Sequence, residues 1–197
     1  MFIQIIQGRC TRQDECREMG ERWKRELAPG AEGWLGGTYG FTDDDQFMAI
    51  VRFDSRESAA RNSQRPEQGA WWRDMEALFE GPVEFHDCDD VTLMLDGGSD
   101  DAGFVQVIRG KVDDAATMKN MMTDTEQLHE MRPDIIGGTL AIEEDGTFIE
   151  TIAFTDEESA RRGEHIEMPE DVRRAMESAM HDVSYADLHH PWFASRA

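Results

Sequence analysis

The sequence is poor in lysine and contains no long apolar segment. Its basic residues are mostly arginine, with lysine only at positions 24, 111 and 119, and 42 acids against 20 bases give a formal net charge of −22. A surface this negative repels phosphate backbones and anionic lipids, so we expect neither nucleic acid nor a membrane as a partner. No apolar run approaches the roughly 20 residues that cross a bilayer, and the N-terminus lacks the basic and apolar regions of a signal peptide.

Cysteines and nucleotide-binding motifs are also scarce. Cys10, Cys16 and Cys88 have no metal-ligand spacing, and three cysteines cannot all pair within one chain. Reduced thiols are typical of a cytoplasmic protein, which is the location we expect. Glycine-rich phosphate loops, a nucleophile elbow and zinc-ligand spacings are absent from the sequence. We therefore expect no cofactor and no metal, and neither ATP hydrolysis nor serine-type hydrolysis.

What the sequence does contain is an internal repeat. The segment FIQIIQGR at 2–9 returns as FVQVIRGK at 104–111, and residues 35–61 align with 136–162 at ten identical positions. A period near 100 residues is too long for a solenoid and matches one small domain. The pattern therefore predicts a tandem duplication.

Each copy predicts the same order of secondary structure. Runs of β-branched and aromatic residues predict strands at 2–7, 34–42, 46–53 and 82–88, and again at 104–109, 135–143, 147–154 and 182–188. Apolar residues at helical spacing predict helices at 11–27 and 113–131, and a further helical stretch follows Pro66 and Pro169. The order β-α-β-β-α-β in each copy is that of a ferredoxin-like unit.

The repeat sets the expected domain boundaries. We assign 1–95 to the first α+β unit, 96–103 to a Gly- and Asp-rich linker, and 104–197 to the second α+β unit. In the strand at 2–7 both faces are largely apolar, so something must cover each face. Helices cover one face, and the natural cover for the other is the sheet of the second copy. We thus predict two ferredoxin-like units packed sheet to sheet, as a pseudo-dimeric α+β barrel within one chain.

At this point the sequence resembles a known family. The order of elements, the Gly-Gly-Thr strand and the segment FDSRESAARNSQRPEQGAWW at 53–72 resemble the dimeric α+β barrel superfamily, specifically its antibiotic-biosynthesis-monooxygenase-like domains. The resemblance covers nearly the whole chain, twice over. It implies a pocket in each unit between sheet and helices. It also implies that a cofactor-free enzyme of this kind would surround an electron-rich phenol with Asn, Trp and Tyr or Arg.

The first copy offers residues of these types for a ligand pocket. They are Arg52, Asn62, Trp71, Trp72 and His86. The aligned positions of the second copy carry Ala153, Gly163, Val172, Arg173 and Ala186. The copies have therefore diverged, and a polar and aromatic lining of the first copy would suit a flat aromatic ligand. The alternatives stay open: both Trp side chains can simply pack on the sheet, and Arg52 can be a charge at a strand edge.

Two further features invite a functional interpretation. Glu150 shares a predicted strand face with Phe148, Ile152 and Phe154, where an unpaired carboxylate is costly. It therefore reaches a pocket or a basic partner, or the predicted register is wrong. The segment FHDCDD at 85–90 contains metal-ligand types, but neighbours on a strand point to opposite faces. We interpret this segment as a strand that runs into an acidic loop.

Three functions fit these observations. The first is a tandem α+β barrel protein that binds a small apolar or aromatic molecule, as a monomeric pseudo-dimer or a low-order homo-oligomer. The second is a cofactor-independent monooxygenase acting on a polycyclic or phenolic substrate. The third is a non-catalytic stress-related or scaffolding barrel. An open, polar-lined cavity would favour the enzyme, whereas units without a cavity would favour the scaffolding barrel.

Overall fold

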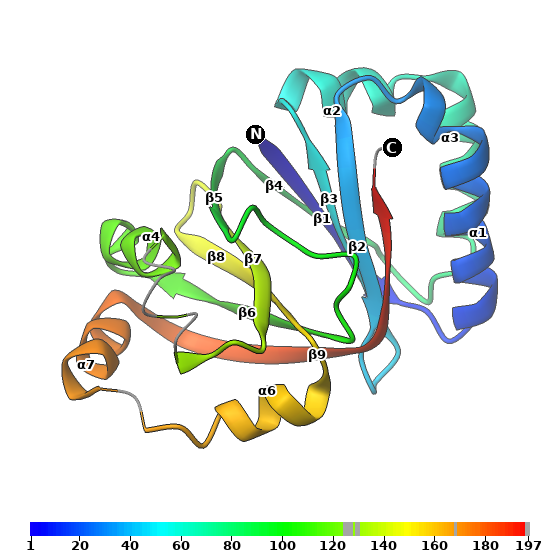
Figure 1. Ribbon diagram of the computed structural model, residues 1–197. Coiled ribbons are helices and arrows are strands. Elements are labelled where there is room, and N and C mark those ends of the chain that lie inside the picture. Colours follow the sequence, from blue (N-terminus) through cyan, green and yellow to red (C-terminus); the bar gives the residue numbers. More distant parts are fainter. Residues whose placement is uncertain (124–127, 129–130, 168, 196–197) are drawn as a thin grey trace. The chain divides into compact units, whose positions relative to one another are not determined.

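The computed structural model describes residues 1–123, 128, 131–167 and 169–195 (Figure 1). Over these residues the chain forms two compact units. Unit 1 comprises Met1–Asp89 together with the end of the chain from Trp192, and unit 2 comprises Asp90–Pro191. No helix within the described ranges is long and apolar enough to span a bilayer.

Unit 1 has the predicted order of elements. They are β1 (Phe2–Arg9), α1 (Gln13–Glu26), the 3-10 helix η1 (Ala28–Gly30), β2 (Trp34–Phe41), β3 (Gln46–Phe53), α2 (Arg56–Ser63), α3 (Pro66–Glu76), β4 (Glu84–Cys88) and the end of β9 (Met180–Ser195). The strands lie in the order β4-β1-β3-β2-β9, and β1 pairs antiparallel with both β3 and β4. The first four strands of this order form the ferredoxin-like sheet.

Unit 2 repeats the arrangement. Its elements are β5 (Asp90–Met94), β6 (Phe104–Val112), α4 (Ala115–Thr123), β7 (Ile135–Ile142), β8 (Thr147–Phe154), α6 (Glu157–Gly163), α7 (Glu170–Ala179) and most of β9. The strand order is β9-β6-β8-β7-β5. The predicted helix at 113–131 is described through α4, and residues 124–127, 129 and 130 lie outside the described part of the chain. The ferredoxin-like α+β units predicted from the repeat are therefore confirmed.

The fifth strand of each unit comes from residues that the repeat assigns to the other copy. After β4 the chain passes directly into β5, which pairs with β7 in unit 2. Likewise β9 pairs with β6 in unit 2, and its last residues lie beside β2 in unit 1. The units therefore do not end at the expected boundaries of 1–95 and 104–197. The packing of the two sheets against each other stays a prediction.

This exchange of strands explains the first glycine of the repeated Gly-Gly-Thr motif. A Cβ on Gly36 would lie 2.9 Å from the carbonyl oxygen of Ala194, and a Cβ on Gly137 would lie 1.9 Å from that of Gly97. Each of these glycines thus makes room for the backbone of the segment that joins its unit from elsewhere in the sequence. Gly36 also has a φ of 149°, which side-chain-bearing residues rarely adopt.

Candidate functional site

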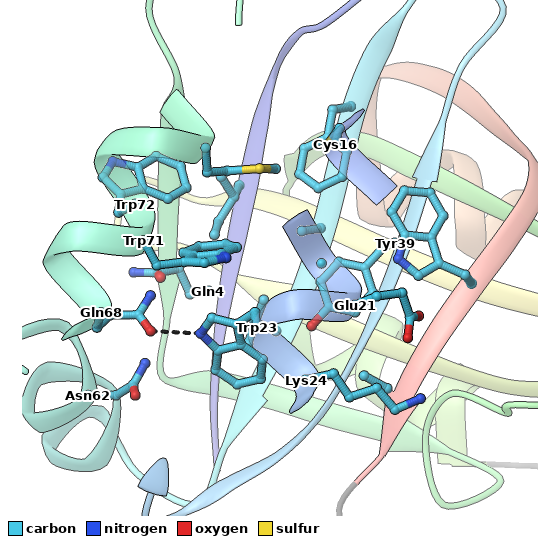
Figure 2. A pocket seen from close by; sticks show the side chains of 18 of the residues that line it. Gln4, Cys16, Glu21, Trp23, Lys24, Tyr39, Asn62, Gln68, Trp71 and Trp72 are labelled. Carbon is cyan, nitrogen blue, oxygen red and sulfur yellow. Dashed lines mark hydrogen bonds between the residues drawn. The ribbon is translucent and has the colours of Figure 1, made fainter. Parts of the chain in front are cut away.

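A cavity lies within unit 1, between the sheet and helices α1, α2 and α3 (Figure 2). Its volume is about 100 Å³. Its floor consists of strand side chains that alternate onto one face of the sheet. These are Gln4, Ile6, Tyr39, Phe47, Ala49, Val51 and Phe53. The helices therefore face a floor that is apolar except for one amide and one phenol.

Four tryptophans form much of the remaining wall. Trp23 comes from α1, Trp71 and Trp72 come from α3, and Trp192 comes from β9. The Trp71 indole N–H donates to the carbonyl oxygen of Met19 at 3.0 Å, which ties α3 to α1. Figure 1 shows these two helices side by side on one face of the sheet. The aromatic wall is thus fixed to two helices that hold each other in place.

Two side-chain amides line the cavity with their oxygen atoms already hydrogen-bonded. The Asn62 oxygen accepts from the Arg65 guanidinium at 3.0 Å, and the Gln68 oxygen accepts from the Trp23 indole at 2.7 Å. Arginine and tryptophan can only donate, so these contacts fix which way each amide points. Neither NH₂ group has an acceptor among the described residues. Both are available to donate to a ligand.

The ionisable groups around the cavity differ in their exposure. Glu21 and Lys24 of α1 are exposed, so they mark the side where the cavity meets solvent. Cys16 is buried, and that burial raises the pKa of its thiol. The thiol therefore stays protonated and is a poor nucleophile. Within the described residues, no group of three His, Cys, Asp or Glu side chains could hold a metal ion.

No protein-family profile and no curated protein matches the sequence, but solved structures resemble the fold. A proposed monooxygenase from Lactobacillus acidophilus NCFM has a TM-score of 0.75 at 12% identity, over 98% of this chain and 95% of that one. An anthrone oxidase-like protein has a TM-score of 0.63 at 11% identity, over 98% and 92%. A ferredoxin-fold protein of Listeria monocytogenes 4b F2365, described as uncharacterized and related to antibiotic biosynthesis monooxygenases, has 0.50 at 9%, over 95% and 94%.

The chain has the ferredoxin-like α+β fold of these structures. At identities this low the likeness establishes the fold and not the activity. The coverage of both units by single chains of similar length agrees with the duplication seen in the sequence.

Within this fold, three of the predicted residues come together. Asn62, Trp71 and Trp72 all line the cavity of unit 1. Figure 2 shows them with Gln68 on one side of the cavity, and Tyr39 on the other side. We predicted these three as pocket residues because each is replaced by a residue of different chemistry in the second copy.

Arg52 and His86 are not part of this cavity, contrary to the prediction. Arg52 pairs with Ile3 across β1 and β3, and His86 pairs with Ile5 across β1 and β4. Directly opposed residues in an antiparallel pair share one face of the sheet. Ile3 and Ile5 lie on the face opposite to Gln4, so Arg52 and His86 point away from the cavity.

Glu150 lies in unit 2 and therefore outside the cavity. It shares the predicted face of β8 with Phe148 and Phe154 and stands opposite Leu140, so the predicted register is confirmed. Burial raises the pKa of its carboxyl to about 7. It has no hydrogen-bond or ion-pair partner in the part of the chain that the structure describes. Its position corresponds to Ala49 of the cavity floor, so the two units differ at this point.

Sequence reasoning missed four residues of the wall. Trp23 and Gln68 are linked by a hydrogen bond, which the sequence does not reveal. Gln68 and Tyr39 both differ between the copies, because Pro169 and Leu140 stand at the aligned positions, and this difference could have identified them. Trp192 belongs by sequence to the second copy, and only the exchange of the last strand brings it to unit 1.

Proposed function

We propose that unit 1 binds a small planar aromatic molecule in the cavity between its sheet and helices. The observation that supports this proposal is the composition of the cavity wall. Its tryptophans come from helices that are hydrogen-bonded to each other, and the orientation of its two amides is fixed by Arg65 and Trp23, which can only donate. Apolar walls with a few fixed polar groups are what small-molecule sites share. A scaffolding protein needs no such cavity, and this weighs against the third interpretation.

The size of the cavity limits the ligand. An apolar cavity of about 150 Å³ admits one benzene ring. The cavity here, at about 100 Å³, is of the same order. We therefore propose a single substituted ring as the part of the ligand that enters. A polycyclic molecule would have to extend past Glu21 and Lys24 into solvent.

The test is the effect of Trp72→Ala on the binding of acetophenone, followed by ligand-observed NMR. Trp72 lines the cavity, and its ring packs edge-on against Phe85 at 5.2 Å. Removing a half-buried indole should weaken binding by about 1–3 kcal/mol. Phe85→Ala is the matched control, because Phe85 is 47% exposed and contacts Trp72 from outside the lining. A Trp72→Ala protein that is less stable but binds with unchanged affinity would refute the proposal.

A second function, cofactor-independent oxygenation of a phenol, is favoured by the two amide donors. Oxidation of 2,6-dimethylphenol by O₂ gives 2,6-dimethyl-1,4-benzoquinone and one water, so O₂ is the only other reactant. The phenolic proton must first pass to solvent at the side of the cavity beside Glu21 and Lys24, and negative charge then develops on the phenol oxygen. Fixed N–H donors in a site withdrawn from water stabilise such a charge. The fold shared with proposed monooxygenases supports the same chemistry.

Isosteric variants test this second function. Asn62→Asp keeps an acceptor for Arg65 but removes the N–H donors, and Gln68→Glu does the same beside Trp23. We expect ¹⁸O from labelled O₂ in the quinone, with turnover lowered about 10-fold or more in either variant. Binding of the phenol without uptake of O₂ would contradict oxygenation and leave the binding proposal standing.

A further inference from the structure

The ring of Tyr39 packs against the strand that carries it. Tyr39 lies on β2 opposite Ala49, so its side chain is on the cavity face. A Cβ on Gly37 would lie 2.4 Å from the Tyr39 hydroxyl oxygen and 2.6 Å from Cζ. The ring therefore lies along its own strand, over the glycine two residues earlier.

Trp192 holds the same ring from another direction. The two rings stack with centroids 5.8 Å apart and an interplanar angle of 20°. Trp192 is itself held, because the Arg17 guanidinium lies 4.1 Å from its ring centroid and Phe41 and Phe47 pack against it at 5.7 and 6.1 Å. Tyr39 thus has little freedom to turn its hydroxyl elsewhere.

The Tyr39 hydroxyl has no hydrogen-bond partner among the described residues. A ligand oxygen in the cavity could therefore accept a hydrogen bond from this hydroxyl, and such a bond makes a modest net contribution to binding. Burial also raises the pKa of Tyr39, with a smaller opposing effect from Arg52. The phenol therefore stays protonated and can donate.

Unit 2 lacks this arrangement although it keeps its framework. Gly138 stands where Gly37 stands, but Leu140 replaces Tyr39. Leu140 pairs with Glu150, as Tyr39 pairs with Ala49, so the register is the same in both units. The hydroxyl is thus a feature of unit 1 and not of the shared fold.

We propose that the Tyr39 hydroxyl donates a hydrogen bond to an oxygen of the bound aromatic molecule, and that Trp192 is a positioning residue that keeps Tyr39 in place. This rests on the proposed binding function and deepens it. The ligand class becomes a single ring bearing a carbonyl or phenolic oxygen. The last strand of the chain then controls specificity in unit 1.

The experiment compares acetophenone with α-methylstyrene, which has the same planar shape but a CH₂ group in place of the oxygen. Affinities are measured by ligand-observed NMR. Tyr39→Phe keeps the ring and removes the hydroxyl, so it should weaken acetophenone about 3- to 10-fold and leave α-methylstyrene unchanged. The ratio of the two affinities is insensitive to a general loss of folding.

Two further variants test positioning. Gly37→Ala should displace the Tyr39 ring, and Trp192→Leu should release it, so each should lower the affinity ratio toward that of Tyr39→Phe. Trp192→Phe keeps a stacking ring and should restore the ratio. An unchanged ratio in Tyr39→Phe, with both probes bound, would overturn this inference and leave the binding function intact. Failure of both probes to bind the native protein would overturn both.

Discussion

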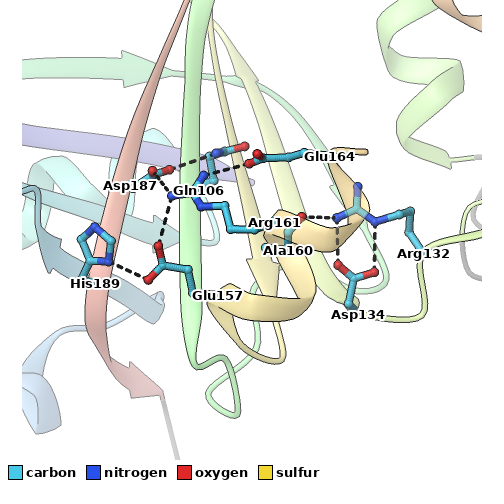
Figure 3. A network of polar contacts seen from close by, with 9 residues as sticks. All are labelled: Gln106, Arg132, Asp134, Glu157, Ala160, Arg161, Glu164, Asp187 and His189. Atoms are coloured by element: carbon cyan, nitrogen blue, oxygen red, sulfur yellow. Dashed lines mark hydrogen bonds and ion pairs between the residues drawn. The ribbon is translucent and has the colours of Figure 1, made fainter. Parts of the chain in front are cut away.

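Arg161 of unit 2 is predicted to be the side chain whose charge matters most for the stability of that unit. Its guanidinium contacts Asp187, lies 2.8 Å from a Glu164 oxygen and lies 3.2 Å from a Glu157 oxygen (Figure 3). The same group lies 5.2 Å from the centroid of the Phe104 ring. Arg161→Ala removes the cation on which these three carboxylates converge.

The expected loss in the free energy of unfolding follows from these contacts. Half-exposed ion pairs contribute about 0.2–1 kcal/mol each, and an exposed cation–π contact contributes about 0.5–1 kcal/mol. Arg161→Ala should therefore lower the free energy of unfolding by about 1–3 kcal/mol, or the Tm by roughly 3–10 °C for a chain of this length. Urea denaturation at pH 7, followed by circular dichroism, measures this loss.

The neighbouring arginine provides the control. The Arg162 guanidinium contacts Glu158, and the two side chains are 62% and 85% exposed. Arg162→Ala should therefore cost less than about 0.5 kcal/mol. Both variants remove one positive charge, but Arg161 contacts three carboxylates and Arg162 contacts one. Equal losses of stability would therefore show that these contacts do not stabilise the unit.

The deficit should also depend on pH. Burial alone would raise the pKa of Asp187, but bonds from Arg161 and Gln106 hold it below its ordinary value. A carboxyl with a lowered folded-state pKa contributes stability above its unfolded pKa and loses it as the pH falls through the folded value. The difference between native protein and Arg161→Ala should therefore shrink as the pH is lowered below about 4.

Two further predictions concern charge. Because 42 acids face 20 bases, raising NaCl from low concentration to about 0.5 M should raise the Tm by more than in a near-neutral protein of this size; a flat response would mean that the acids are locally paired. Glu150, with its pKa raised to about 7, makes the folded state bind more protons than the unfolded chain from about pH 4.5 to 7, so it lowers stability as the pH rises through that window. Glu150→Gln should abolish this fall and be up to about 3 kcal/mol more stable than the native protein at pH 8, and equal pH profiles would contradict it.

The repeat predicted the ferredoxin-like units because hydrophobic alternation and turn residues are local. The strands predicted at 34–42 and 46–53 match β2 and β3 closely. In contrast, β5 and the full length of β9 were missed. Whether residues 90–94 form a strand depends on β7, which is distant in sequence and supplies their backbone partners.

Local sequence also conceals an equivalence between the units. In unit 1, Arg56 contacts Asp87 and Asp89 and lies 4.9 Å from the centroid of the Phe2 ring. Arg161 has the corresponding role in unit 2, yet Arg56 aligns with Glu157. The two arginines differ by about one helical turn and reach the same place on the sheet. Alignment by position therefore could not identify them as counterparts.

For the candidate site, the differences between the two copies identified some of the lining residues. The sequence did not show which face of the sheet each strand residue lies on. Asn62, Trp71 and Trp72 were found because each is replaced in the second copy. His86 is replaced as well, but its direction depends on the register between β4 and β1, which the sequence does not specify. Trp192 was missed because its neighbours are in the other copy.

Binding of an oxygen-bearing aromatic ring in the cavity of unit 1 can be seen in a crystal structure of the protein grown with saturating acetophenone. We expect the ring in the cavity between Trp72 and Tyr39, with its oxygen within hydrogen-bond distance of the Tyr39 hydroxyl. A cavity without the ring, in crystals that bind acetophenone elsewhere on the protein, would show that unit 1 does not receive the ring in this cavity.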